Sequence, residues 1–393
     1  MNQLNTLAKP STSTEATLDL LSLDALLTPI TATLAASAEH YDRSAEFPAA
    51  NFALLRRHGL LALTVPTVQG GPGGRLAEAR KVISAVARGE PSTALILAMQ
   101  YVQHATIQTN PNWSAAVKTK VAKDAIEHGA LINALRVEPE LGTPMRGGLP
   151  STTAHRVTDG WIINGSKIFS TGIEGLTWLA VWAKSSDSEP LVGTWLVNRN
   201  TPGVSIVKEW DHLGLRASSS HKVVFENVLV PLDQAVDINP PGALPSGFNT
   251  ISLWMQVLVS SIYDAIARNA RDWFVQWAKS RKPSNLPGGL ADLPHFQVAL
   301  GEVEALLLVN STLLDAAEHF QPHEHGLLKY QVTGNAIRVV ERLLELAGNP
   351  GLTRANPLER YYRDVLCGRV HSPQSDTALG TAGRVAFAGG HGK

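Results

Sequence analysis

Residues 161–172 read Trp-Ile-Ile-Asn-Gly-Ser-Lys-Ile-Phe-Ser-Thr-Gly, and a second apolar run, Thr-Trp-Leu-Ala-Val-Trp-Ala-Lys, follows at 177–184. Asp159-Gly160 and Asn164-Gly165 lie beside these short apolar runs. Such dipeptides are typical of the two-residue turns that join antiparallel strands. The stretch therefore predicts a β-hairpin at the start of a sheet.

The segment between the two apolar runs carries a candidate binding face. Phe169 and Thr171 are two residues apart, so in an extended chain both side chains would lie on one face, and Gly172 would allow a ligand to approach closely. This combination would suit a flat ligand with polar edges. The same spacing is also typical of an ordinary strand, so the local pattern leaves both interpretations open.

The pattern changes from helical to alternating and back along the chain. Apolar residues recur at helical spacing from about 18 to 129 and again from about 248 onward. Between them lie short Val-, Ile-, Trp- and Thr-rich runs: Ala130–Val137, Ser151–Val157, Trp161–Phe169, Thr177–Ala183, Val192–Val197, Val204–Lys208 and Lys222–Leu229. The sequence predicts an α+β fold with a disordered tail (1–16), an N-terminal helical domain (17–129), a central antiparallel β-sandwich or barrel (130–240) and a C-terminal helical bundle (241–393).

Smaller signals refine this prediction. Pro91-Ser92-Thr93 is expected to cap a long apolar helix on which His104 is either a satisfied polar group or faces a ligand. The glycine-rich segment 69–74 lacks the Lys-Ser/Thr ending of a phosphate loop and is interpreted as a connecting loop. His323 and His325 alternate in a loop, which lacks the helical spacing of a metal site, so no metal is predicted.

Composition bounds the function. The 393 residues carry 34 basic and 34 acidic side chains, and this balance offers no field for nucleic acid or an anionic membrane. No membrane-spanning segment is predicted, because no apolar run is expected to reach the roughly 20 residues that span a bilayer. The single cysteine, Cys367, cannot form an internal disulfide, which favours a reducing cytoplasm.

Three ordered motifs carry a resemblance to a known family. They are Glu138-Pro139-Glu140-Leu141-Gly142-Thr143, the 164–172 segment, and Leu213-Gly214-Leu215-Arg216-Ala217-Ser218-Ser219-Ser220 leading into the Val-rich run 223–231. Together they resemble the acyl-CoA dehydrogenase family of flavoproteins, from about Tyr41 to Ala388. The resemblance implies an N-terminal helical domain, a central β-domain and a C-terminal four-helix bundle, assembled as a homodimer or homotetramer.

The resemblance also implies a flavin and the residues that hold it. A flavin ring needs an apolar or aromatic wall and a few polar groups at its edge. Phe169 matches the family's wall residue, Thr171 the hydroxyl near the reactive nitrogen, with Ser170 between them, and Thr143 a residue that contacts the phosphates. Val137 stands where a threonine usually holds the ring edge, and Arg136 replaces a small apolar residue.

In this family a neighbouring subunit completes the adenosine half of FAD. The matching positions are Arg281, which is followed by Lys282 and then by Pro-Ser-Asn instead of Thr-Phe-Gly, and the turn with Glu345 and Gly348. Glu345 stands where glutamine is usual, and its carboxylate would repel a pyrophosphate unless Arg281 offsets the charge. FAD is the first choice of cofactor, and FMN is the alternative.

The usual catalytic base is missing. Dehydrogenation of an acyl thioester needs a carboxylate that takes the α-proton while hydride leaves the β-carbon. In the family this base is commonly a glutamate that follows an Arg-Asp pair, and Ser372 stands at that position after Arg363-Asp364. Some relatives place the glutamate on the first helix of the C-terminal bundle, and the matching position here is about Trp254. Asp264 and Asp376 are candidate displaced bases. His371 matches a histidine that helps deprotonate the substrate in monooxygenases of the same fold, or else lies beside the cap of the last helix.

Two enzymatic functions and one non-enzymatic one follow. The first is α,β-dehydrogenation of an acyl-CoA-type substrate with electron-transfer flavoprotein as the acceptor. The second is a monooxygenase that receives reduced flavin from a flavin reductase. The third is a flavin-free scaffold that keeps the fold without the chemistry. Sequence alone does not identify the substrate, since no pocket dimension can be read from it.

Overall fold

The computed structural model describes residues 20–141, 148–243 and 246–389 of the chain. The first part is helical: α1 (Leu20–Ser44), α2 (Ala49–Arg57), α3 (Leu76–Gly89), α4 (Pro91–Thr109) and α5 (Ala115–His128). The strands are β1 (Leu131–Leu135), β2 (Thr153–Val157), β3 (Gly160–Lys167), β4 (Leu176–Ser185), β5 (Val192–Asn198), β6 (Val204–Val207) and β7 (Lys222–Val230). The last part comprises α6 (Phe248–Ser280), α7 (Pro294–Asp315), α8 (His325–Ala347), α9 (Asn349–Leu352), α10 (Leu358–Leu366) and α11 (Ser375–Phe387).

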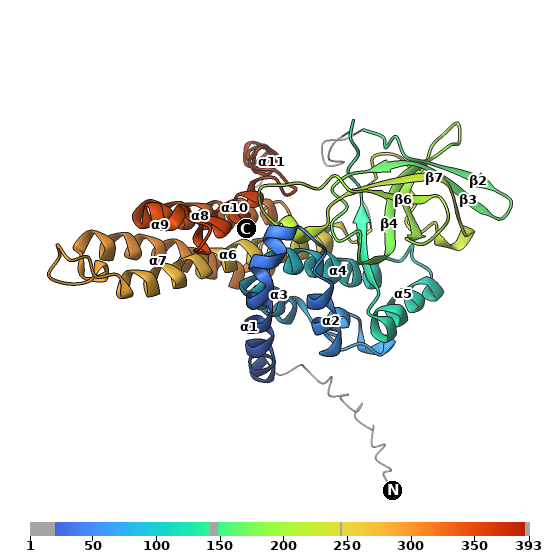
Figure 1. Cartoon of the computed structure of the whole chain (residues 1–393). Coiled ribbons are helices and arrows are strands. Elements are labelled where there is room, and N and C mark those ends of the chain that lie inside the picture. Colours follow the sequence, from blue (N-terminus) through green and yellow to red (C-terminus); the bar gives the residue numbers. More distant parts are fainter. Residues whose placement is uncertain (1–19, 142–147, 244–245, 390–393) are drawn as a thin grey trace, which may run out of the picture.

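The three groups of elements lie in a row. Figure 1 shows the N-terminal helices in the middle, with the curled sheet on one side and the long helices of the C-terminal bundle on the other. The predicted α+β class with its order of helices, sheet and helices is confirmed. The domain boundaries at 129 and 240 stay predictions, and the tail predicted over 1–16 lies outside the described residues.

The seven strands form one mixed sheet in the order β1-β4-β2-β3-β7-β6, with β5 beside β4. The pairs β2·β3, β3·β7, β4·β5 and β6·β7 are antiparallel. The sequence predicts an antiparallel sheet. This is wrong for two pairs, β1·β4 and β2·β4, which are parallel. The chain between each of those strands and β4 is long enough for the crossover that parallel pairing requires.

The hairpin predicted over 161–184 is wrong in its pairing. β3 pairs with β2 through Val157 and Gly160, so the Asp-Gly signal marks the β2–β3 turn. The Asn-Gly signal lies inside β3, at a bulge opposite β7. Gly165 has a φ of +142° there, and a Cβ on it would lie 2.7 Å from the Thr152 backbone. The glycine therefore serves a bulge with a close approach.

The buried start of α4 differs from the predicted cap. Pro91 is the first residue of the helix, and the preceding Glu90 is the N-cap. Its carboxylate accepts the backbone N–H groups of Ser92 at 3.0 Å and Thr93 at 2.7 Å. Burial raises the pKa of Glu90, and these hydrogen bonds offset part of that rise. A carboxylate at this position satisfies donors that the helix cannot pair internally.

The glycine-rich loop after η2 (Thr67–Gln69) has its amides paired within the chain. The N–H of Gly71 donates to Pro66, that of Gly73 to Val65, and that of Gly74 to Leu63. A Cβ on Gly71 would lie 2.2 Å from the Val65 carbonyl oxygen. Glycine is needed for this close backbone approach, and the paired amides are not available to a phosphate.

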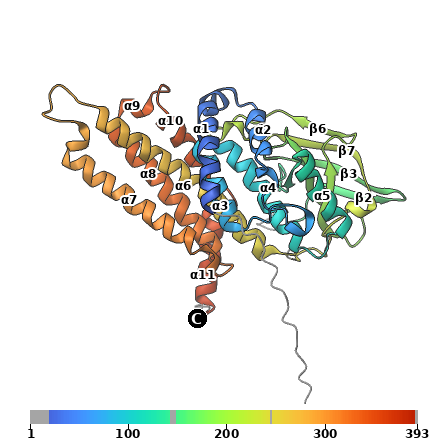
Figure 2. The same ribbon diagram turned by 90° about the horizontal axis from the view of Figure 1, so that it is seen from below.

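The C-terminal helices form a bundle around α6. Figure 2 shows α6, α7 and α8 running side by side, with α10 against them and α11 projecting from one end. Helices α6 and α7 are each long and apolar enough to span a membrane by length and composition. The prediction that no apolar run reaches this length is therefore wrong. Most of that stretch of α6 is buried inside the protein, which is also true of core helices in soluble bundles. His325 opens α8, and its Nδ1 lies 3.2 Å from Ser252 Oγ.

Candidate active site

The loop after β3 presents an aromatic wall. Phe169 adopts a φ of +54° and its side chain is 52% exposed. The rings of Trp210 and His212 meet it edge-on at centroid distances of 6.3 and 6.1 Å, and stack on each other at 3.6 Å. The extended geometry expected for 169–171 is therefore wrong, because β3 ends at Lys167. A left-handed backbone is costly for phenylalanine, and such strain clusters at functional sites.

Backbone hydrogen bonds hold this loop against the 218–221 segment. The Ser170 N–H donates to the His221 carbonyl at 3.2 Å, and the Gly172 N–H donates to the Ser218 carbonyl at 2.8 Å. A Cβ on Gly172, which has a φ of +81°, would lie 2.7 Å from the Ile96 side chain. Glycine at this position therefore lets the loop pack directly on α4.

Two hydroxyls follow Phe169 in the loop. Thr171 Oγ1 lies 3.0 Å from Ser220 Oγ, and the Thr171 carbonyl accepts the Asn133 amide at 3.0 Å. Ser170 Oγ is buried and has no hydrogen-bond partner among the residues that the structure describes. A buried polar atom without a partner is costly unless a ligand or water satisfies it. An exposed aromatic wall next to such hydroxyls fits a flavin ring.

The residues expected at the ring edge lie beside the same loop. The Val137 carbonyl accepts the N–H of Ile168 at 3.0 Å, which places Val137 next to Phe169. Arg136 lies over the Trp182 ring at 5.9 Å. Burial lowers the pKa of Arg136, and the nearby charge of Asp237 offsets part of that shift. A half-buried guanidinium at this edge offers a positive charge to a bound group.

A buried ion pair anchors the Glu138 segment to β3. Lys167 Nζ donates to Glu138 Oε1 at 2.6 Å, and both side chains are almost completely inaccessible to solvent. The same carboxylate accepts the N–H groups of Ser151 at 2.6 Å and Thr152 at 3.0 Å. Burial alone would raise the pKa of Glu138, but its hydrogen bonds outweigh that effect and hold the pKa below the ordinary value. Burial lowers the pKa of Lys167 to about 8.

A cavity of about 660 Å³ lies between α4, the sheet and the start of α6. Its walls include Arg136 and Trp182 from the sheet side and Met255 from α6. Asp237 is the only carboxylate among the described residues that line it. The Asp237 carboxylate accepts side-chain amides from Asn110, Asn112 and Asn239 at 2.6–3.0 Å. These hydrogen bonds occupy the oxygens of the carboxylate.

His371 lies in the connection between α10 and α11, and its ring faces α6. Its ring is 5.7 Å from that of Tyr263, and His371 Nε2 and Tyr263 Oη are both buried without a partner among the described residues. Burial, helped by the charge of Lys329, lowers the pKa of His371 to about 4. The ring is therefore neutral near pH 7, and its unpaired nitrogen can accept or donate a hydrogen bond. Ser372, by contrast, is exposed.

Lys329 fixes the turn that carries His371. Its Nζ donates to the carbonyls of His371 at 2.6 Å and Pro373 at 3.1 Å. Lys329 is 2% exposed, and burial lowers its pKa to about 8. The ammonium group thus both holds the turn and acts electrostatically on the imidazole.

Replacing Lys329 by methionine is expected to move the acid limb of the activity–pH profile to higher pH. This prediction takes the neutral imidazole of His371 as the proton acceptor; removal of the neighbouring positive charge raises the pKa of His371 toward its ordinary value. The measurement is kcat and kcat/KM from pH 4 to 9. Lys329→Arg keeps the charge and should leave the limb in place. An unshifted limb in Lys329→Met would contradict this role.

Asp264 and Asp376 each have partners of their own. Asp264 pairs with Arg268 at 2.7 Å and accepts the Asn310 amide at 3.0 Å, on the side of α6 that meets α7. Asp376 is exposed in the first turn of α11, where it accepts the Thr377 N–H at 2.8 Å. Neither arrangement favours a catalytic base.

Hydrogen bonds link the segment that holds the Phe169 loop to α10, the helix that precedes His371. The Leu215 N–H donates to Asp364 Oδ1 at 2.7 Å, which ties the 214–220 segment to α10. Burial raises the pKa of Asp364 to about 7. From the sequence, Asp364 is used only to locate the position of the family's glutamate, and Tyr263 and Lys329 are not identified as site residues. A lysine inside the apolar run of α8 is the signal that could have indicated Lys329.

The residues expected to complete a neighbour's cofactor lie far from Phe169. Arg281 is the exposed C-cap of α6, Gly348 ends α8, and Glu345 pairs with Arg342 at 2.7 Å. The C-terminal ends of α6 and α8, which carry these positions, lie at the end of the bundle remote from the sheet (Figure 1). Thr143, expected at the phosphates, lies outside the described residues.

Comparisons with known proteins cover most of the chain. The family models described as acyl-CoA dehydrogenase N-terminal, middle and C-terminal domains match residues 26–113, 137–228 and 255–385. YdbM of Bacillus subtilis (strain 168), whose name assigns it provisionally to the acyl-CoA dehydrogenases, is 34% identical over 86% of this chain and 89% of its own. L-evernosamine nitrososynthase of a Micromonospora species is 28% identical over 89% and 86%.

Solved structures share the same fold. KijD3 in complex with FMN and a dTDP-linked amino keto sugar has a TM-score of 0.82 at 24% identity, over 98% of both chains. FMN-bound TdsC from Paenibacillus sp. A11-2 has a TM-score of 0.79 at 23% identity, over 94% of this chain and 98% of its own. Butyryl-CoA dehydrogenase from Megasphaera elsdenii has a TM-score of 0.83 at 19% identity, over 97% and 100%.

Proposed function

Since the chain belongs to the acyl-CoA dehydrogenase family, we propose that it is a flavin-dependent monooxygenase built on that fold. The observation that carries this proposal is that the family's catalytic glutamate is absent from both of its usual positions, while a histidine lies nearby in the sequence. Ser372 and Trp254 occupy the two positions where the family places its glutamate, while a neutral His371 offers a buried, unpaired nitrogen. This arrangement suits removal of a proton from a nitrogen or oxygen of the substrate better than removal of a carbon-bound α-proton.

The residues of the chain would divide the work between binding and proton transfer. Phe169 would form the wall of the flavin ring, and Ser170 and Thr171 would donate to its polar edge. The bound flavin would supply the electrons that activate oxygen. His371 Nε2 would take the substrate's proton, with Lys329 fixing the turn that carries it. The apolar walls of the cavity at α6 would exclude bulk water.

The cofactor is FAD in this proposal, with FMN as the alternative. FAD would need a second copy of the chain, since Arg281 and Gly348 lie at the remote end of the bundle and could only meet a neighbour's cofactor. The assembly would be a homodimer or homotetramer in the cytoplasm, supplied by a flavin reductase. Mass spectrometry of the flavin released by heat distinguishes FAD from FMN.

Dehydrogenation of an acyl-CoA thioester, which the sequence places first, is the second candidate. It is favoured by the 34% identity to a protein with an acyl-CoA dehydrogenase name and by the 26% identity to mouse short-chain specific acyl-CoA dehydrogenase. In that case Arg136 at the cavity would meet a negative group of the thioester or the flavin, and electron-transfer flavoprotein would be the acceptor.

One pair of assays separates the candidates. Purified protein is mixed without oxygen with a panel of acyl-CoA thioesters, and then supplied with reduced flavin, oxygen, and amine and aromatic substrates. Oxygen-dependent product with no anaerobic bleaching supports the monooxygenase. Bleaching by a thioester overturns it in favour of the dehydrogenase. Protein that neither binds flavin nor turns over would be the flavin-free scaffold.

Replacing Thr171 by valine is expected to weaken flavin binding about tenfold, because it removes the hydroxyl that meets the ring edge while keeping the shape. The measurement is the Kd from quenching of flavin fluorescence, together with the rate of flavin reduction. Thr312→Val makes the same chemical change on the exposed side of α7 and should behave as wild type. Unchanged affinity and unchanged reduction kinetics in Thr171→Val would count against this placement of the ring.

A further inference from the structure

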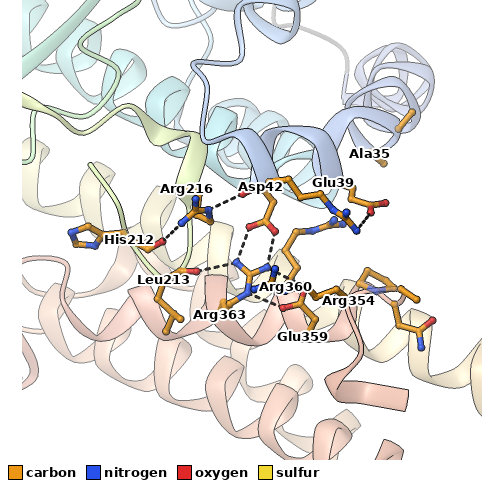
Figure 3. A pocket seen from close by; sticks show the side chains of 15 residues that line it. Ala35, Glu39, Asp42, His212, Leu213, Arg216, Arg354, Glu359, Arg360 and Arg363 are labelled. Carbon is orange, nitrogen blue, oxygen red and sulfur yellow. Dashed lines mark hydrogen bonds and ion pairs between the residues drawn. The ribbon is translucent and has the colours of Figure 1, made fainter. Parts of the chain in front are cut away.

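A second pocket, of about 640 Å³, lies outside the site described above. We call it the arginine pocket, because its walls carry Arg43, Arg216, Arg354, Arg360 and Arg363. Figure 3 shows α1 along one wall, the 354–363 segment along the opposite wall, and the loop at 212–216 at one side. Three segments far apart in the sequence therefore build it.

Some of the arginines are held by carboxylates and carbonyls of the pocket itself. Arg363 makes a bidentate pair with Asp42 at 2.8 and 2.6 Å and a second with Glu359 at 2.8 and 3.1 Å. Arg216 donates to the Asp42 carbonyl at 2.7 Å, and Arg43 pairs with Glu39 at 2.5 Å. These pairs fix the shape of the pocket and leave little capacity for another anion.

Arg354 and Arg360 have no carboxylate partner within the described ranges of the chain. The guanidinium carbon of Arg360 lies 5.7 Å from the centroid of the Tyr361 ring, and the charge of Arg360 also acts on the buried Asp364. The five arginines of the wall face three carboxylates of the wall, Glu39, Asp42 and Glu359, and Arg216 also pairs with Asp211 at 3.1 Å, which leaves an excess of one positive charge. In a concave surface with low-dielectric walls, such an excess attracts anions.

The start of α10 adds backbone donors to the same wall. Pro357 is the N-cap of α10 and makes no side-chain cap hydrogen bond. Pro357, Glu359 and Arg360 all line the pocket. The first N–H groups of a helix have no internal acceptor, and its positive dipole end favours an anion. Phosphate is the anion that combines best with paired guanidinium groups and a helix N-terminus.

We propose that the arginine pocket binds a phosphate-bearing small molecule of nucleotide size, through Arg354, Arg360 and the N-terminal amides of α10. Its volume is within the range of ligand pockets. None of the flavin-loop residues Phe169, Ser170 and Thr171 lines it. The site is therefore separate from the flavin, although His212 lines this pocket and also stacks on Trp210 beside Phe169.

The test is calorimetric titration of the flavin-saturated protein with inorganic pyrophosphate and, separately, with ADP. Saturable binding is expected that weakens about tenfold or more in Arg354→Gln and in Arg360→Gln, because each removes one charge-assisted hydrogen-bonding group. Arg57→Gln removes an exposed arginine of α2 and should bind as wild type. Circular dichroism and the melting temperature establish that each variant is folded.

The competing outcomes are separable. No saturable binding to wild type, or equal affinity in all three variants, overturns the proposal. Release of flavin by pyrophosphate, or binding only to flavin-free protein, also overturns it, because the anion would then occupy the cofactor's own phosphate site. The result does not depend on which reaction the flavin performs, since no turnover is measured.

Discussion

Replacing His371 by glutamine is expected to lower substrate oxygenation by about 10²–10⁴-fold while the flavin stays bound. Glutamine preserves the size and a hydrogen-bonding group but cannot take a proton near pH 7. The imidazole is suited to the task because burial and the charge of Lys329 lower its pKa to about 4, so that the ring is neutral at pH 7 and one of its nitrogens can accept a proton. Steady-state kcat, with flavin content measured by absorbance, is the readout.

The control for this experiment is His319→Gln, which changes an exposed histidine in the 3-10 helix η7 (Ala317–His319) that follows α7. Its turnover should equal that of wild type. Turnover in His371→Gln within about threefold of wild type would remove His371 from the mechanism. If kcat falls and flavin is lost together, the histidine would be holding the cofactor site, and the proton would have to go elsewhere.

Local patterns predicted the elements better than their pairing. Every predicted strand overlaps one of β1 to β7, because period-two alternation is a property of each segment alone. The partner of each strand depends on long-range packing, and an Asn-Gly pair looks the same in a turn as in a bulge. Gly165 shows the difference, since the proximity of Thr152 becomes visible only in the folded chain.

The candidate site divides in the same way. Phe169, Thr171 and His371 are predicted because they belong to motifs with a family resemblance, and their roles stay predictions. Tyr263 and Lys329 were missed because each stands alone in an apolar helix, where sequence gives burial but not partners. The two carbonyls that Lys329 meets come from residues more than 40 positions away.

The same reasoning explains why Asp264 was a weaker candidate than its sequence suggested. A carboxylate where the family has glycine stands out in a sequence, and this one is buried. Its neighbour Arg268 and the amide of Asn310 satisfy it, which sequence could not show. A buried charge is therefore informative only once its partners are known.

Replacing Glu138 by glutamine is expected to lower the free energy of unfolding by about 3–5 kcal/mol, because it leaves the ammonium group of Lys167 buried without its counter-ion. Lys167 has no exposed side-chain surface, so water cannot replace the lost partner. The Glu138 carboxyl has a pKa below its ordinary value, so its stabilisation is present at neutral pH. It is lost as the pH falls through that lowered pKa.

The measurement is urea unfolding followed by circular dichroism, with the midpoint and the melting temperature compared at pH 7. Glu140→Gln, an exposed change two residues away, should stay within about 0.5 kcal/mol of wild type. The double variant Glu138→Gln, Lys167→Met should recover part of the loss, because no unpaired charge remains to be buried. If the single and double variants are equally unstable, the cost would come from the lost Ser151 and Thr152 hydrogen bonds instead of the stranded lysine.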